Sequence, residues 1–170
     1  MTHPDFRDIL TPVQLAISVV VPFTGVLAVT SPHRRLSRRL LAAEALAAGC
    51  ALAGVLLAAI VSGTRPPAER LAVLVLGSVL VQLIAQSVGT GCGLLVRRRP
   101  LAMAATIVVP MGVTVVLGAL DPGGGLVRWL TPYGNARALL AGRPTAALAV
   151  VVLLWCVLPN VAGRKSTVDG

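Results

Sequence analysis

The chain alternates between long apolar runs and short polar segments. Five runs, residues 11–30, 40–62, 71–96, 101–120 and 145–162, approach or exceed the roughly 20 apolar residues that cross a bilayer as a helix. Backbone groups in lipid must be hydrogen-bonded within their own segment, so each run is predicted to be a spanning helix. The expected fold is an all-α, polytopic membrane helical bundle that forms a single transmembrane domain over residues 1–170.

The longest polar connection, residues 121–144, carries structure of its own. It begins with turn-forming residues, Asp121-Pro122-Gly123-Gly124-Gly125. Apolar residues then fall on two short helical faces: Leu126, Trp129 and Leu130 on one, and Ala136, Leu139 and Leu140 on the other. Trp129 and Tyr133 suit the headgroup level. We expect short re-entrant or interfacial helices here, and the alternative is a flexible loop.

Composition supports a membrane protein. Hydrophobic residues make up 56% of the chain and charged residues 12%, about half the usual share. The net charge of +9 suggests nucleic acid, but the basic residues cluster between the apolar runs, which favours the positive-inside rule instead. No nucleic-acid partner is therefore expected. The three cysteines lie inside apolar runs without metal-binding spacing, which is typical of packing residues.

The distribution of basic residues predicts an orientation. If the N-terminus lies outside, the inner segments carry nine Lys and Arg residues and the longer outer segments carry six. This favours a multi-pass protein of the cell membrane, here the inner membrane of a bacterium, with the N-terminus outside and the C-terminus in the cytoplasm. The arginine cluster at Arg34, Arg35, Arg38 and Arg39 would then face the cytoplasm.

The predicted spans hold no charge near their middle. Glu44 lies about one turn from the predicted cytoplasmic end, where it is expected to pair with Arg38 or Arg39. Gln82 and Gln86 share a helix face and either join helices or line a pathway. Small residues at four-residue spacing, Gly89 with Gly93 and Ala43 with Ala47 and Ala51, let helices approach closely.

Motifs for catalysis are missing from the sequence. "GRKST", residues 163–167, lacks the glycine order of a P-loop, and the glycines of "GTGCG" follow no strand. Membrane phosphatidyl-alcohol transferases need further aspartates to hold metal ions, and only Asn135-Ala136-Arg137 is found here. We therefore expect no enzyme activity, no catalytic residues, no metal and no cofactor in this chain.

Several segments resemble permease subunits of type-2 ABC exporters. "GVLAVTS" followed by basic residues and "RLLAAEALAA" is similar to the family's second and third spans. "GLLVRRRPLAMAATIVVPMGVTVVLGAL" is similar to the fourth and fifth, and "PGGGLVRWLTPYGNARALLAG" to the outer re-entrant helices that precede the last span. Family members usually have six spans, and the first has no counterpart here. Pro32-His33 also replaces an expected acid, and the first cytoplasmic loop is short.

The resemblance implies a membrane-spanning subunit that forms a translocation path with a second permease chain, in a homo- or heterodimer. ATP would be bound by separate ATPase subunits. The four clustered arginines would form a short basic helix, started by Pro32 and capped by Ser31, that contacts the ATPase. Two alternatives stay open: the arginines only set topology beside anionic lipid, or the chain is an accessory or immunity protein that packs against another membrane protein.

Overall fold

The computed structural model describes residues 5–31, 36–63, 66–96, 98–143 and 145–168, and describes side chains as far as Arg164. Within these ranges the chain forms helices and turns and no strand, which confirms the all-α prediction. The elements are α1 (Phe6–Thr30), α2 (Leu36–Ser62), α3 (Ala68–Leu95), α4 (Arg99–Leu120), α5 (Gly125–Leu130), α6 (Pro132–Leu140), α7 (Ala147–Val151), the π-helix η1 (Val152–Val157) and α8 (Leu158–Val168).

Five helical segments are long and apolar enough to cross a membrane: α1, α2, α3, α4 and the continuous run Ala147–Arg164. The chain is thus a multi-pass membrane protein, as the apolar runs predicted. Most helices begin before their apolar run, because polar residues extend the first turn. In α1 the Asp5 side chain caps the helix by accepting a hydrogen bond from the Phe6 amide at 3.0 Å.

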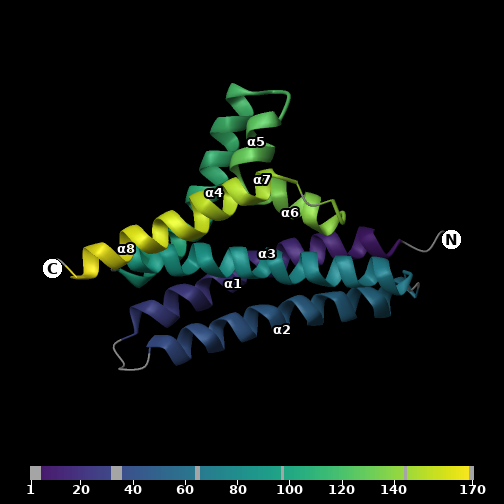
Figure 1. Ribbon diagram of the computed structural model, residues 1–170, viewed down its shortest axis with the longest axis horizontal. Helices are drawn as coiled ribbons and strands as arrows, with labels where there is room; N and C mark the ends of the chain where they lie inside the picture. Colours follow the sequence, from purple (N-terminus) through teal and green to yellow (C-terminus); the bar gives the residue numbers. More distant parts are fainter. Residues whose placement is uncertain (1–4, 32–35, 64–65, 97, 144, 169–170) are drawn as a thin grey trace.

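Three of the long helices, α1, α2 and α3, lie side by side and form a three-helix bundle (Figure 1). At one end of this bundle α1 connects to α2 and α3 connects to α4, and α8 ends nearby. We call this the basic end, because Arg38, Arg39, Arg98, Arg99 and Arg164 gather there. Helix α3 is the centre of the molecule, since α1, α2, α4, α6 and α8 all pack against it.

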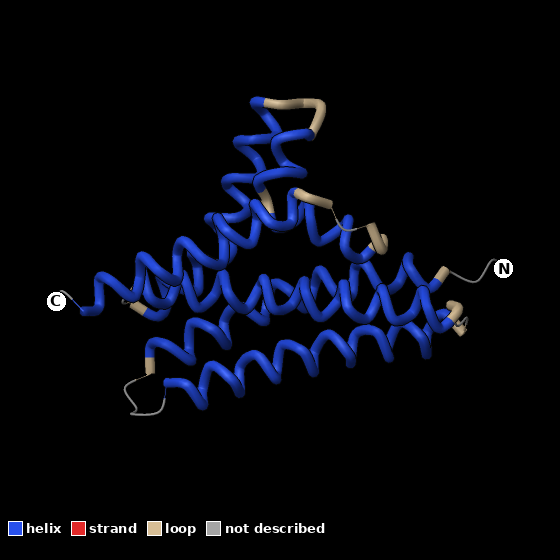
Figure 2. The backbone as a smooth tube through the Cα atoms, viewed as in Figure 1, coloured by secondary structure: helices blue, strands red, loops and turns tan. Residues whose placement is uncertain are grey.

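Helix α4 leaves the basic end and leans away from the bundle (Figure 2). Helices α5 and α6 then return toward α3, and the final run α7–η1–α8 goes back to the basic end. The three buried residues of α4, Ala102, Thr106 and Pro110, all lie between its start and its middle, and none lies beyond Pro110. Its second half is therefore separated from the three-helix bundle.

Candidate functional site

A groove of about 550 Å³ lies where α4 separates from α1, and the α5–α6 pair closes one side of it. Apolar side chains from α1 and α4 form most of its wall. Thr114, Tyr133 and Arg137 add polar groups. The groove therefore has both apolar and polar groups in its walls, and it is open on the side that no further helix covers. The remaining lining residues are Leu15, Ala16, Val19, Met111, Val115, Val127 and Gly134.

The turn after α4 is held by Asp121. One carboxylate oxygen accepts a hydrogen bond from the Gly123 amide at 3.0 Å, and the other accepts from the Leu126 amide at 2.8 Å. Gly124 has a φ of +73°, a conformation that side chains with a Cβ rarely adopt. These features reverse the chain within a few residues and start α5 beside the end of α4.

The corner between α5 and α6 is fixed by side-chain hydrogen bonds. The Thr131 hydroxyl donates to the Val127 carbonyl at 2.7 Å and accepts from the Gly134 amide at 3.2 Å, which caps α6. The buried Asn135 amide donates to the Arg128 carbonyl at 2.7 Å. From the last span, the Trp155 indole donates to the Leu130 carbonyl at 2.7 Å. The α5–α6 pair is thus a folded unit tied to the final helix.

Helix α6 packs closely on the three-helix bundle. Leu139 and Leu140 are buried together with Val81 of α3. A Cβ at Gly77 would lie 2.7 Å from the Leu139 carbonyl oxygen, so this contact needs a glycine in α3. The Arg7 guanidinium donates to the Ala141 carbonyl and joins the start of α1 to the end of α6.

The predicted outer segment is therefore helical, as expected, and a loop without structure is excluded for its described residues. Its depth in the bilayer stays a prediction. Trp129 is half exposed on α5, whereas Tyr133 is partly buried beside the groove. Burial raises the pKa of the Tyr133 phenol above its ordinary value.

Gln82 and Gln86 lie in the seam between α3 and α1. Both are buried, and the Gln82 amide donates to the backbone oxygen and to the side-chain oxygen of Gln14, each at 2.9 Å. Gln14 in turn donates to the Ala51 carbonyl of α2 at 2.7 Å. The Gln86 amide lies 2.8 Å from the Thr24 hydroxyl. These amides join helices, which is one of the two roles that the sequence left open.

The glycines predicted to allow close approach lie in the same seam. A Cβ at Gly89 would collide with the Pro22 backbone, and a Cβ at Gly93 would lie 3.1 Å from the Val26 Cα. The stripe Ala43, Ala47 and Ala51 is buried on α2. Close helix packing explains why these positions carry small residues.

The arginine cluster is only partly described. Arg34 and Arg35 lie outside the described residues, as does Pro32. Arg38 is exposed and Arg39 is partly buried in the first turn of α2, and Ser31 follows α1 as its C-cap. In the described residues these arginines therefore begin the spanning helix itself, where we predicted a separate basic helix. Arg38 and Arg39 are continuous with the rest of α2 because neither proline nor glycine directly follows them.

The expected pairing of Glu44 with Arg38 or Arg39 is not formed among the described side chains. All three residues are on α2, and separations of five and six positions place their side chains on different sides of the helix. Glu44 instead lines a cavity that also receives Arg164 from α8.

Sequence reasoning missed three polar residues that hold the helices together: Gln14, Asn135 and Asn160. Asn160 of α8 donates to the Ser87 carbonyl of α3 at 3.0 Å and accepts from the Thr90 hydroxyl at 2.9 Å. A signal was present, because Gln14 and Asn160 interrupt apolar runs in the same way as Gln82. Their partners could not be inferred without the packing of the helices.

Comparison with protein-family models, with curated proteins and with solved structures finds no match to this chain.

Proposed function

We propose that this chain is a permease subunit of an ATP-driven exporter, and that the groove between α1 and α4 is half of the translocation path. The observation that carries the proposal is the groove beside the α5–α6 pair, which is open on one side. Two short helices between the fourth and fifth spans are also what the resemblance to type-2 ABC exporters implies. A second permease chain, identical or different, would supply the missing wall.

The energy source would be a partner protein. The five apolar runs of the sequence carry no charge at their centre that a proton or sodium gradient could act on. Separate ATPase subunits would bind ATP and dock at the basic end, where Arg38 and Arg39 begin α2. There the Arg99 guanidinium donates to the Thr30 carbonyl at 3.1 Å, which holds the α3–α4 connection beside α1. Guanidinium groups suit a carboxylate-rich surface on such a partner.

The proposal also sets the orientation: the basic end faces the cytoplasm, and the α5–α6 pair faces the outside. A reporter fused after the last residue should be active only in a form that functions in the cytoplasm. Activity of an external reporter at that position would invert the assignment and remove the ATPase from the basic end.

Copurification tests the function directly. The tagged chain, expressed in its native host and extracted in mild detergent, should copurify with an ATP-hydrolysing subunit. The double variant Arg38→Gln/Arg39→Gln should lower the recovered ATPase activity several-fold, because it removes charges that contact the partner. The matched control Arg128→Gln, an exposed arginine on α5, should leave recovery unchanged.

Two results would contradict the proposal. Recovery of a different membrane protein with no ATPase would favour the accessory or immunity role. An unchanged ATPase yield in the double variant would leave Arg38 and Arg39 as topology determinants that contact anionic lipid.

A further inference from the structure

A second cavity, of about 240 Å³, lies between α2, α3 and α8 near the basic end. We propose that it binds the zwitterionic headgroup of an aminoalkyl phospholipid such as phosphatidylethanolamine. The proposal is independent of the exporter function, since it concerns a different set of helices from the groove. The polar lining residues are Glu44, Gln86, Ser87, Thr90, Asn160 and Arg164.

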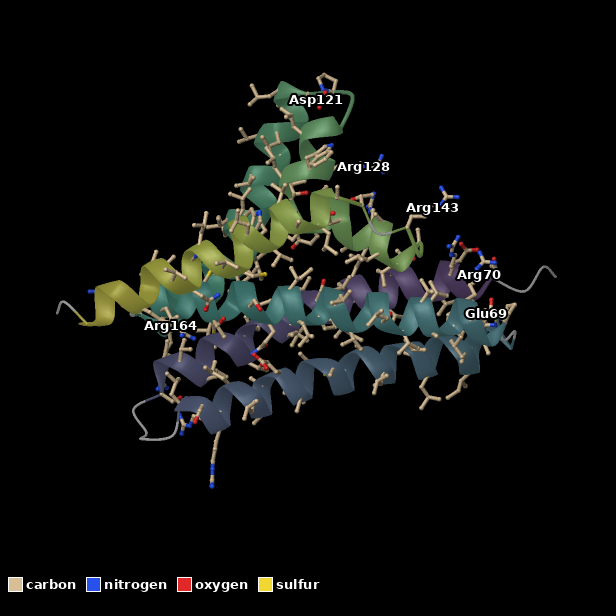
Figure 3. All side chains as sticks on the ribbon, in the orientation of Figure 1. Glu69, Arg70, Asp121, Arg128, Arg143 and Arg164 are labelled. Atoms are coloured by element: carbon tan, nitrogen blue, oxygen red, sulfur yellow. The ribbon has the colours of Figure 1, made fainter. Side chains whose placement is uncertain are left out.

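The cavity brings opposite charges from two helices to one space. Glu44 projects from α2 and Arg164 from α8, and both α2 and α8 pack against α3. Figure 3 shows Arg164 at the end of the molecule opposite to Glu69 and Arg70. Glu44 stands eight residues after the start of α2, about 12 Å along the helix, and is thus within the span Leu36–Ser62.

The Glu44 carboxylate is available for a ligand. Among the described residues it forms no hydrogen bond or ion pair, although it is the only charged residue of α2 after Arg39. An ionised carboxylate inside a span is costly unless a cation or hydrogen-bond donors compensate it. An ammonium group in the cavity would supply both.

The polar wall of the cavity is already rigid. Asn160 uses its amide to donate to the Cys156 carbonyl at 2.7 Å and to the Ser87 carbonyl at 3.0 Å. Its oxygen accepts from Thr90, so α8 is locked onto α3 beside the cavity. Glycines also tighten this joint, because a Cβ at Gly91 would lie 2.8 Å from the Pro159 side chain. A preformed wall lowers the cost of ordering a bound headgroup.

The chemistry of the lining selects one class of headgroup. Arginine binds phosphate through its planar fork, and a carboxylate binds ammonium. A ligand with both groups close together matches Arg164 and Glu44. None of the described lining residues is aromatic, whereas recognition of a quaternary ammonium such as choline uses aromatic cages. The lining therefore favours a primary amine with three N–H donors.

A lipid is favoured over a soluble zwitterion because the cavity has apolar neighbours. Leu40 and Val157 are among its lining residues, and Leu41 and Leu158 are exposed nearby on α2 and α8. These side chains would contact acyl chains while the headgroup occupies the polar space. A free aminoalkyl phosphate would gain nothing from them.

Lipid retention by the full chain tests the proposal. Purified protein is titrated with phosphatidylethanolamine, phosphatidylcholine or phosphatidylglycerol in mixed micelles, and bound lipid is counted by native mass spectrometry. We expect preferential retention of phosphatidylethanolamine. We expect Glu44→Gln and Arg164→Gln each to weaken it about tenfold, because each removes one charge of the pair. Glu69→Gln and Arg70→Gln, two adjacent residues of opposite charge at the other end of the molecule, are the matched controls and should retain the preference.

The following results would each contradict part or all of the proposal. Equal retention of the three lipids, or unchanged retention in Glu44→Gln, overturns the site. Loss of retention in the Glu69 and Arg70 controls also overturns it, because the effect would then be general charge. Free phosphoethanolamine that competes at the same concentration as the lipid would assign the cavity to a soluble zwitterion and overturn the lipid source. Circular dichroism and the unfolding midpoint without added lipid verify that each variant is folded.

Discussion

Helices α3 and α4 are almost equally apolar, yet α3 lies at the centre of the molecule and α4 lies at its periphery. Of the most apolar window of each helix, 44% is buried in α3 and 17% in α4. The difference lies in their other residues. Helix α3 carries glycines and buried amides on the faces that meet α1 and α6, whereas α4 carries Val115, Val116 and Leu120 exposed in its second half. In a bilayer, small and polar residues decide which helix is central, because lipid competes equally for any apolar surface.

The sharpest test of this difference is a pair of glycine substitutions. Gly89→Leu places a side chain against the Pro22 backbone and should separate α3 from α1, at a cost of about 3 kcal/mol or more. Gly112→Leu in α4 is the matched control, because a Cβ there meets nothing within 4 Å. It should be neutral or stabilising by up to about 1 kcal/mol. Unfolding in mixed micelles, followed by circular dichroism, measures both. Similar losses in the two variants would refute the distinction between a packed α3 and a separated α4.

A smaller effect is expected for the buried amide of α3. Gln82→Met removes two hydrogen bonds to Gln14 and should cost about 1 kcal/mol. The cost is limited because the Gln82 side-chain oxygen is buried without a partner among the described residues, and its removal is favourable. A double-mutant cycle with Gln14→Met measures the coupling. Additive losses in the cycle would show that the two amides do not interact.

The turn beyond α4 gives a local effect. Asp121→Ala removes the carboxylate that accepts from Gly123 and Leu126, and should cost about 1 kcal/mol. Hydrogen exchange should become faster in α5 and stay unchanged in α3. Asp8→Ala, an acidic residue in the first turn of α1, is a control outside this turn. Faster exchange throughout α3 would mean that the turn supports the whole bundle.

The smallest effect is predicted for the exposed face of α4. Val116→Ala should change the unfolding free energy of the isolated chain by less than about 0.5 kcal/mol, because Val116 is 58% exposed. Val26→Ala in α1 is its fully buried counterpart and should cost about 1–2 kcal/mol. If Val116→Ala destabilises the isolated chain as much as Val26→Ala, the second half of α4 is packed rather than separate.

Much of the fold followed from the linear pattern. Apolar length alone predicted five spans, since the bilayer thickness sets a minimum that soluble helices rarely meet. The turn residues at Asp121–Gly125 and the two apolar faces after them predicted short helices, which α5 and α6 are. The predicted starts of the helices were less accurate. Helix α1 begins at Phe6 rather than at residue 11, because Asp5 is its N-cap and the polar residues that follow form the first turn.

The partners of the polar residues needed the tertiary structure. The sequence identified Gln82 as a polar residue on a helix face, but its bond to Gln14 joins positions 68 residues apart. Glu44 was assigned to nearby arginines, whereas the packing of α8 on α3 places it beside a cavity shared with Arg164. Such contacts depend on which helices are neighbours, and apolar length does not determine neighbours.

Two physical processes therefore separate what the sequence could predict from what it could not. Membrane insertion depends on the hydrophobicity of each segment taken separately, so the sequence by itself determined the five spans and the short helices after α4. Helix association depends on close contact between particular surfaces, where a single Cβ or amide changes the energy. Only the tertiary structure could therefore place α3 at the centre, separate α4 from the bundle to form the groove, and bring Glu44 and Arg164 to one cavity.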